Sequence, residues 1–144
     1  MPASVLICGA GPVGMVLALE LARFGVFVRI IDKNSDRTDK SKALAVWSRT
    51  LELLERSGTA STLIDAGRKT RAVRIMSSSD TIARISFDEL ASPFPFVLMV
   101  PQSETERVLE EKLAAMGVTV ERDTELVGFT DGGADVTCQL SSAD

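Results

Sequence analysis

A glycine-rich turn between two short apolar runs constrains the fold of this chain more than any other feature. The first run, Val5 to Cys8, lacks polar alternation, which is typical of a strand buried on both faces of a parallel sheet. The motif G-x-G-x-x-G follows at once, from Gly9 to Gly14, and opens an apolar helical pattern. The second run, Val26 to Ile31, ends in Asp32. This order predicts a strand–helix–strand unit with parallel strands.

The spacing of the motif is also that of a dinucleotide site. Gly9 would allow a tight turn, Gly11 would let a pyrophosphate approach the backbone, and Gly14 would let the helix pack close to the strand. Asp32 stands 18 residues after Gly14, where a carboxylate can accept hydrogen bonds from both hydroxyls of a ribose. The alternative is a strand–helix–strand unit whose glycine turn is purely structural and whose acid is solvated.

Composition narrows the class of protein. The 144 residues suit one domain, and a net charge of −4 argues against a nucleic-acid binder with a basic surface. No apolar run reaches the roughly 18 residues that cross a bilayer. Histidine is absent and the two cysteines lie far apart, so a Cys/His zinc site is excluded. We expect Cys8 to be an inert core residue, and we expect a reducing, cytoplasmic setting without a secretory signal or a membrane partner.

The middle of the chain carries a cationic loop and a helix. Residues 33–42 are polar and include Lys33 and Lys42, so they form either a solvated surface loop or a loop over an adenosine and a pyrophosphate. A helical pattern begins at Ser48, a suitable N-cap, and Trp47 before it is expected in the core. Arg49 lies at the start of that helix, where the helix dipole disfavours a cation. An arginine at this position therefore favours a functional role over a plain exposed charge.

The second half changes to antiparallel patterns. Residues 68–71 are basic and are expected to form a solvated connection. Residues 72–77 and 81–87 alternate with period two, which predicts an antiparallel hairpin with one solvated face. Ser103 to Glu106 is a capping box that predicts the start of a helix, and Asp131 to Gly133 predicts the turn of a further hairpin.

Over essentially all its length, the chain resembles the N-terminal part of the p-hydroxybenzoate-hydroxylase-like, or group A, FAD-dependent aromatic monooxygenases. The resemblance rests on residues 5–14, on Asp32, on the helix Arg49 to Leu54 and on Val100 to Arg107. It implies an α/β fold: a Rossmann-like βαβ FAD-binding unit of the second glutathione-reductase type, with a partial antiparallel substrate-domain hairpin. The implied division is 1–71 for the first part of the FAD-binding domain, 72–96 for the start of the substrate-domain sheet, and 97–144 for a return to the FAD-binding domain.

The same resemblance implies the roles of single residues around FAD. The pyrophosphate would be wrapped by the glycine motif, and Asp32 would hold the adenosine ribose. Gln102 would reach the ribityl or pyrophosphate side, although a plain polar group at a helix start is the alternative. Lys42 stands where many members have arginine. Lysine keeps the positive charge but cannot form the bidentate contact that an arginine makes. The full set of implied cofactor-binding residues is Gly9, Gly11, Val13, Gly14, Asp32, Lys33, Lys42, Arg49 and Gln102.

The implied activity is that of an NAD(P)H- and oxygen-dependent flavin monooxygenase acting on a small aromatic, phenolic substrate, with molecular oxygen as co-substrate. Family members are several times longer, so the chain is expected to be a fragment, and no catalytic acid or base is assigned within it. Two alternatives remain: another FAD- or NAD-linked oxidoreductase without oxygen insertion, and a non-catalytic nucleotide-binding module.

Overall fold

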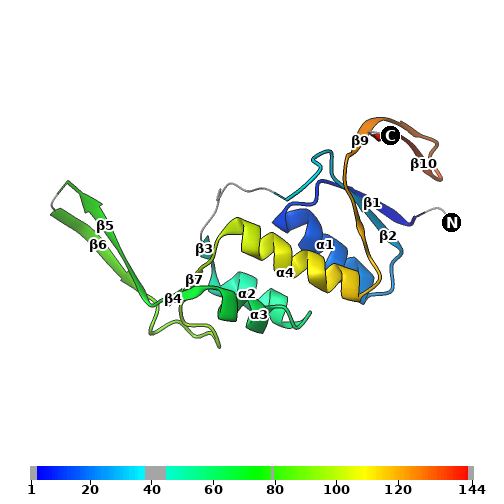
Figure 1. Ribbon diagram of the computed structural model, residues 1–144. Helices are drawn as coiled ribbons and strands as arrows, with labels where there is room; N and C mark the ends of the chain where they lie inside the picture. Colours follow the sequence, from blue (N-terminus) through cyan, green and yellow to red (C-terminus); the bar gives the residue numbers. More distant parts are fainter. Residues whose placement is uncertain (1–2, 38–44, 79, 143–144) are drawn as a thin grey trace. The chain divides into compact units, whose positions relative to one another are not determined.

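The computed structural model describes residues 3–37, 45–78 and 80–142 (Figure 1). The chain forms two compact units, residues 1–38 with 109–144, and residues 39–108. Helix α4, Gln102–Ala115, contributes residues to both. Among the described residues no helix is both long and apolar enough to cross a membrane.

The first unit is built on a parallel sheet. Strand β1 (Val5–Cys8) pairs in parallel with β2 (Val28–Ile31), and helix α1 (Pro12–Arg23) connects them. Strand β8 (Val120–Glu121) pairs in parallel with the other edge of β2, giving the order β1-β2-β8. The expected strand–helix–strand unit is therefore confirmed, and the carboxyl ends of β1 and β2 meet at one edge of the sheet.

Strand β1 was expected to be buried on both faces, but both β1 and the apolar helix α1 are only partly buried. Only Ile7 is buried in β1, and Cys8 is exposed, because β1 is the edge strand of this sheet. Cys8 is therefore not a core residue. Helix α1 buries one face, with Met15 fully enclosed, whereas Val13 is 85% exposed. An uninterrupted apolar pattern shows which residues prefer burial, but it does not show how many neighbouring elements are present to cover them.

An antiparallel hairpin completes the first unit. Strands β9 (Thr124–Asp131) and β10 (Val136–Ser142) pair in the predicted arrangement. Gly133 has φ +83° in the turn, and its N–H donates to Asp131 Oδ1 at 2.8 Å. The turn therefore uses the residues that the sequence indicated.

The second unit contains a three-stranded antiparallel sheet and two short helices. Its elements are β3 (Ala45–Val46), α2 (Ser48–Glu55), α3 (Ala60–Ala66), β4 (Arg68–Thr70) and β7 (Val97–Met99), with strand order β3-β7-β4. The prediction that residues 68–71 form a solvated connection is correct for their exposure but wrong for their structure, since Arg68 to Thr70 pair with β7. Backbone pairing supplies an ordering force that a run of charged side chains does not reveal.

Two expectations at the start of α2 are also wrong. Ser48 is the first helical residue rather than the cap, and its hydroxyl donates to the Phe96 carbonyl at 3.1 Å. Trp47 is 55% exposed rather than buried, and its ring meets Phe87 edge-on at 6.0 Å. The Ser48 hydroxyl is buried, so a partner outside the helix replaces the capping bond.

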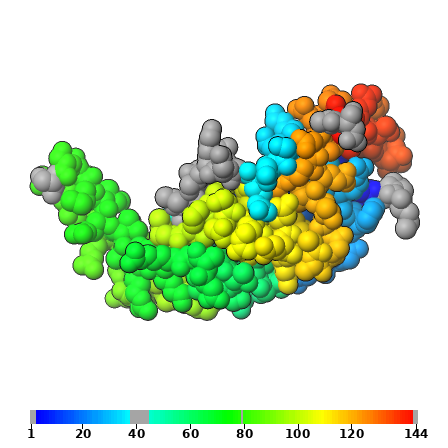
Figure 2. Space-filling view, in the orientation of Figure 1, coloured from blue at the N-terminus to red at the C-terminus, as the bar shows by residue number. Residues whose placement is uncertain are grey.

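The remaining hairpin and the start of α4 follow the sequence more loosely. Strands β5 (Ala72–Ser77) and β6 (Asp80–Ser86) pair as predicted, but almost every residue of both strands is exposed, so neither face of the hairpin is buried. Figure 2 draws the hairpin in green, with its surface toward the viewer uncovered. Helix α4 begins at Gln102, one residue before the expected capping serine, Ser103. In its first turn the Thr105 hydroxyl donates to the Pro101 carbonyl at 3.4 Å.

Candidate nucleotide site

The three glycines of the motif lie in three different environments. Gly9 has φ +106°, a conformation that other residues rarely adopt. A Cβ on Gly14 would lie 2.0 Å from the Gly9 carbonyl oxygen, so the close approach of α1 to the loop requires glycine there. A Cβ on Gly11 would meet nothing within 4 Å, and the Gly11 backbone is extended. The fold alone explains Gly9 and Gly14, whereas the space beside Gly11 is left open at the loop.

The N-terminus of α1 opens at this loop. Pro12 occupies the first helical position, and the Met15 N–H makes the first intrahelical bond, 3.0 Å to the Gly11 carbonyl. The N–H groups of Val13 and Gly14 come before that bond and have no carbonyl four residues earlier within the helix. With the positive end of the helix dipole, they suit an anion at the loop.

Asp32 closes the same loop from the end of β2. One carboxylate oxygen, Oδ2, accepts the Ala10 N–H at 2.7 Å, and Oδ1 accepts the Asn34 N–H at 2.9 Å and the Asn34 side-chain amide at 2.7 Å. The side chain is only 12% exposed. This burial is the largest single influence and on its own would raise the Asp32 pKa. The bonds from Asn34 and Ala10, together with the charge of Arg122, outweigh it and lower the pKa below the usual value.

A cavity of about 380 Å³ lies beside this carboxylate. It is formed by the ends of β1 and β2 and the start of β9, with the lining residues Cys8, Gly9, Ile31, Asp32, Lys33, Asn34, Thr124, Glu125 and Leu126. Its volume lies within the range of roughly 300–1,000 Å³ that small-molecule sites occupy. The cavity therefore stands at the carboxyl ends of the parallel strands, where open α/β sheets bind ligands.

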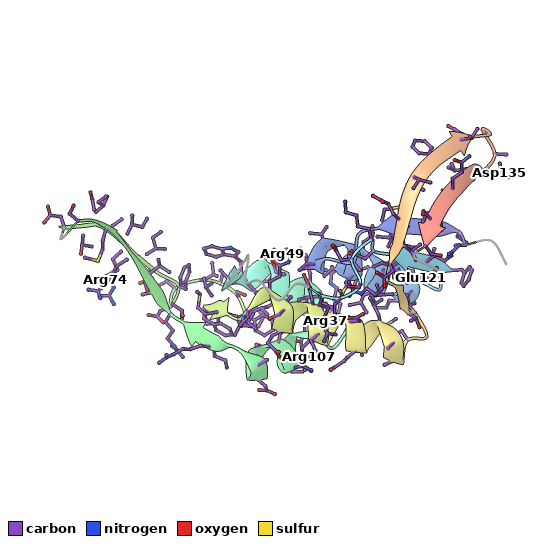
Figure 3. All side chains as sticks on the ribbon, turned by 45° about the horizontal axis from the view of Figure 1, so that its top comes forward. Arg37, Arg49, Arg74, Arg107, Glu121 and Asp135 are labelled. Carbon is purple, nitrogen blue, oxygen red and sulfur yellow. The ribbon has the colours of Figure 1, made fainter. Side chains whose placement is uncertain are left out.

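Charged side chains outside the loop surround Asp32. Arg122 Nη1 lies 4.0 Å from Asp32 Oδ2, and Arg122 Nη2 donates to Glu110 at 3.2 Å. Glu110 also accepts a bond of 2.9 Å from Arg37, which is labelled in Figure 3. At the cavity itself Lys33 Nζ lies 3.8 Å from Glu125 Oε1. The charged groups around the site are thus paired, and one lining residue, Asp32, is an ionised carboxylate.

Cys8 lines the cavity but is not activated. Desolvation by the surrounding atoms raises the pKa of its thiol, and Cys138 raises that pKa further. A thiol with a raised pKa is mostly protonated at neutral pH, and the thiolate is the nucleophilic form. Cys8 therefore contributes surface to the cavity, and its surroundings do not favour the thiolate.

The predicted site residues divide between the two units. Gly9, Asp32 and Lys33 come together at the cavity, and Gly11, Val13 and Gly14 follow in the adjoining loop and helix start. Arg49 and Gln102 belong to the second unit. There, Arg49 Nη1 donates to Glu52 at 2.7 Å, and the Gln102 amide donates to Glu106 at 2.7 Å. Lys42 lies outside the described residues.

Sequence reasoning did not single out several neighbours of Asp32. Asn34 had a local signal, because an Asx turn joins an aspartate to the residue two positions later. Arg122, Glu110 and Glu125 are 76 or more positions away from Asn34, and no short motif connects them to it. They approach because β8 pairs with β2, so that the Asp32 N–H donates to the Glu121 carbonyl at 2.9 Å.

Comparison with known proteins matches this arrangement to a family. The family model described as "FAD binding domain" matches residues 2–144. The chain belongs to this family. Its fold is accordingly the mixed α/β fold of FAD-binding aromatic hydroxylases, and the strand–loop–helix unit with Asp32 is the part of it that the sequence motif had marked.

Two curated relatives are named as monooxygenases. The chain is 39% identical over 138 residues to 6-methylpretetramide 4-monooxygenase of Streptomyces rimosus, covering 94% of this chain and 25% of that protein. It is 36% identical over 114 residues to pentachlorophenol 4-monooxygenase of Sphingobium chlorophenolicum, covering 78% of this chain and 21% of that protein. The anhydrotetracycline hydroxylase structure from Streptomyces rimosus matches with a TM-score of 0.89 and 29% identity, over 99% of this chain and 29% of that one. The chain thus spans between a fifth and a third of the length of these relatives.

Proposed function

We propose that the first unit binds the adenosine and pyrophosphate of FAD. The observation that carries the proposal is the loop from Gly9 to Gly14 beside a cavity whose central group, Asp32, is an ionised carboxylate. The open space at Gly11 fits a pyrophosphate approaching the backbone, and the α1 N-terminus suits its charge. Asp32 and Lys33 face the cavity, where they would meet the ribose and its surroundings.

The residues of this chain would bind and orient the cofactor, while FAD, when bound, supplies electron transfer and the activation of oxygen. Asp32 would accept hydrogen bonds from the ribose, and the N–H groups of Val13 and Gly14 would donate to phosphate oxygens. We further propose that Lys42, Arg49 and Gln102 take part in binding the cofactor. The cation at Arg49 is paired with Glu52, whose pKa is lowered by hydrogen bonds first from Arg49 and then from Ser92.

For the whole protein we propose an NAD(P)H- and oxygen-dependent monooxygenase that hydroxylates an aromatic, phenolic ring. Support comes from two relatives, which are named 6-methylpretetramide 4-monooxygenase and pentachlorophenol 4-monooxygenase. In this proposal residues 1–71 and 97–144 belong to a Rossmann-like FAD-binding domain of the second glutathione-reductase type. The β5–β6 hairpin, within residues 72–96, begins the sheet of a substrate domain. The two free cysteines fit a reducing, cytoplasmic setting.

The test uses the protein expressed from its complete reading frame. Released nucleotide is analysed after denaturation, and oxygen uptake is measured with NADH or NADPH and a panel of phenols. We expect FAD in the released fraction and substrate-dependent oxygen uptake that matches the hydroxylated product. Reduced-nucleotide oxidation without a hydroxylated product would instead support an oxidoreductase that does not insert oxygen. Absence of flavin, with no binding of added FAD, would contradict the cofactor proposal itself.

A further inference from the structure

The acceptor positions of Asp32 are nearly all occupied by the protein itself. An ionised carboxylate offers about four lone-pair directions, two on each oxygen. Both directions of Oδ1 are taken by Asn34, through its backbone N–H at 2.9 Å and its side-chain amide at 2.7 Å. On Oδ2 the Ala10 N–H takes one direction at 2.7 Å. Arg122 approaches Oδ2 only to 4.0 Å, which is too long for a hydrogen bond.

A ribose diol brings two O–H donors, and one carboxylate holds both when each oxygen has a free direction. Oδ2 has one, whereas Oδ1 has none while both Asn34 donors remain. Backbone bonds hold the Asn34 main chain, because its carbonyl accepts the Asp123 N–H at 3.3 Å and the Thr124 N–H donates to the Asp32 carbonyl at 3.0 Å. The Asn34 side chain is exposed, and its amide bonds only to Asp32 among the described residues. The side-chain amide is therefore the donor that gives way.

We propose that the Asn34 amide occupies the place of one ribose hydroxyl on Asp32 and is displaced when the nucleotide binds. The inference rests on the proposed function and adds a specificity-determining residue to it. A ligand with both hydroxyls must break the Asn34–Asp32 bond in order to use Oδ1. A ligand with a single hydroxyl uses the free direction on Oδ2 and leaves Asn34 in place. Asn34 therefore weakens binding of the diol selectively and reduces the preference of the site for ribose over deoxyribose.

The test compares Asn34→Ala with the unchanged protein, both freed of flavin, in calorimetric titrations with FAD, ADP and 2′-deoxy-ADP. We expect Asn34→Ala to bind FAD and ADP about threefold to tenfold more tightly, the equivalent of one modest hydrogen bond. Affinity for 2′-deoxy-ADP should change less than about twofold, so the preference of the site for ADP over 2′-deoxy-ADP should rise. The matched control is Asp36→Ala on the same exposed turn, whose carboxylate accepts the Arg37 N–H and does not contact Asp32. It should leave all three constants unchanged.

The inference would be overturned if Asn34→Ala bound ADP equally or more weakly and kept the same preference for ADP over 2′-deoxy-ADP. Weaker binding would make Asn34 a direct ligand contact, and equal binding would give it no part in recognition. Failure of the proposed function gives a different pattern. If the unchanged protein binds ADP but not FAD, the flavin proposal fails while the ADP ratio still decides the role of Asn34. If it binds neither, both proposals fail.

Discussion

Exchanging single glycines of the loop for alanine separates folding from binding. At Gly14 the new Cβ would lie 2.0 Å from the Gly9 carbonyl oxygen and 3.3 Å from Ile7 Cγ2. The nearest obstacle is a backbone atom in a loop that Asp32 also holds, so no flexible side chain can move aside. Overpacking of a core costs about 1–3 kcal/mol and more where the backbone must shift, so we expect Gly14→Ala to lose roughly 3–5 kcal/mol of unfolding free energy.

Gly11→Ala should behave in the opposite way. Its Cβ meets nothing within 4 Å, and the extended backbone before Pro12 suits alanine. We expect the unfolding free energy to stay within about 1 kcal/mol of the starting value, because alanine also restricts the unfolded chain. The methyl group would stand where the pyrophosphate approaches, so FAD affinity should fall at least about tenfold, or roughly 1.4 kcal/mol.

The assay is urea unfolding of the flavin-free protein, followed by fluorescence titration with FAD. A Gly14→Ala variant as stable as the unchanged protein would refute the packing argument. Loss of more than about 2 kcal/mol in Gly11→Ala would show that this glycine also has a structural reason, and unchanged FAD affinity in that variant would place the pyrophosphate elsewhere.

Three further altered proteins have expected outcomes. The pKa of Asp32 is lowered in the folded protein, so its ionised carboxylate contributes stability above the unfolded pKa of about 3.9. This contribution is lost as the pH falls through the folded pKa. Asp32→Asn should therefore reduce the dependence of the melting temperature on pH in the acid range. It should also weaken FAD binding by roughly 1.5–3 kcal/mol per charged hydrogen bond lost, and an unchanged titration would contradict the ribose role. Arg29→Gln breaks the paired bonds of 2.8 and 2.6 Å to Glu121 across β2 and β8, which should cost at most about 1 kcal/mol of stability and leave FAD affinity unchanged, since both groups are partly exposed and away from the cavity. Residues 1–144 expressed alone should bind FAD weakly and hydroxylate no phenol in a product assay, because an isolated hairpin such as β5–β6 is marginal; coupled hydroxylation would contradict this.

The sequence predicted what short-range spacing determines. The strand, glycine loop, helix and closing acid lie within one stretch of 28 residues, from Val5 to Asp32, and their order leaves few alternatives. The turn at Gly133 and the strand pairing of residues 72–86 were likewise local patterns. In each case the decisive contacts join residues that the pattern itself contains.

The predictions failed where a distant partner decides the outcome. The sequence predicted Ser48 as a helix cap, yet its hydroxyl donates a hydrogen bond to the Phe96 carbonyl, 48 positions away. Arg68 to Thr70 read as a solvated connection, yet they pair with β7. Cys8 reads as core because it ends an apolar run, although β1 is an edge strand in the described sheet. Exposure depends on neighbours in space, which a one-dimensional pattern does not specify.

The bond from the Ala10 N–H to Asp32 has a consequence for the speed of recognition. It joins residues 22 positions apart at 2.7 Å, so the loop from Gly9 to Gly14 is held in place when the protein folds. If this loop binds a nucleotide as proposed, the ligand meets a segment whose conformational entropy has already been lost, and we expect association to be limited by diffusion and orientation. Sequence changes at this site should therefore alter mainly the residence time of the cofactor, while its rate of capture stays nearly constant.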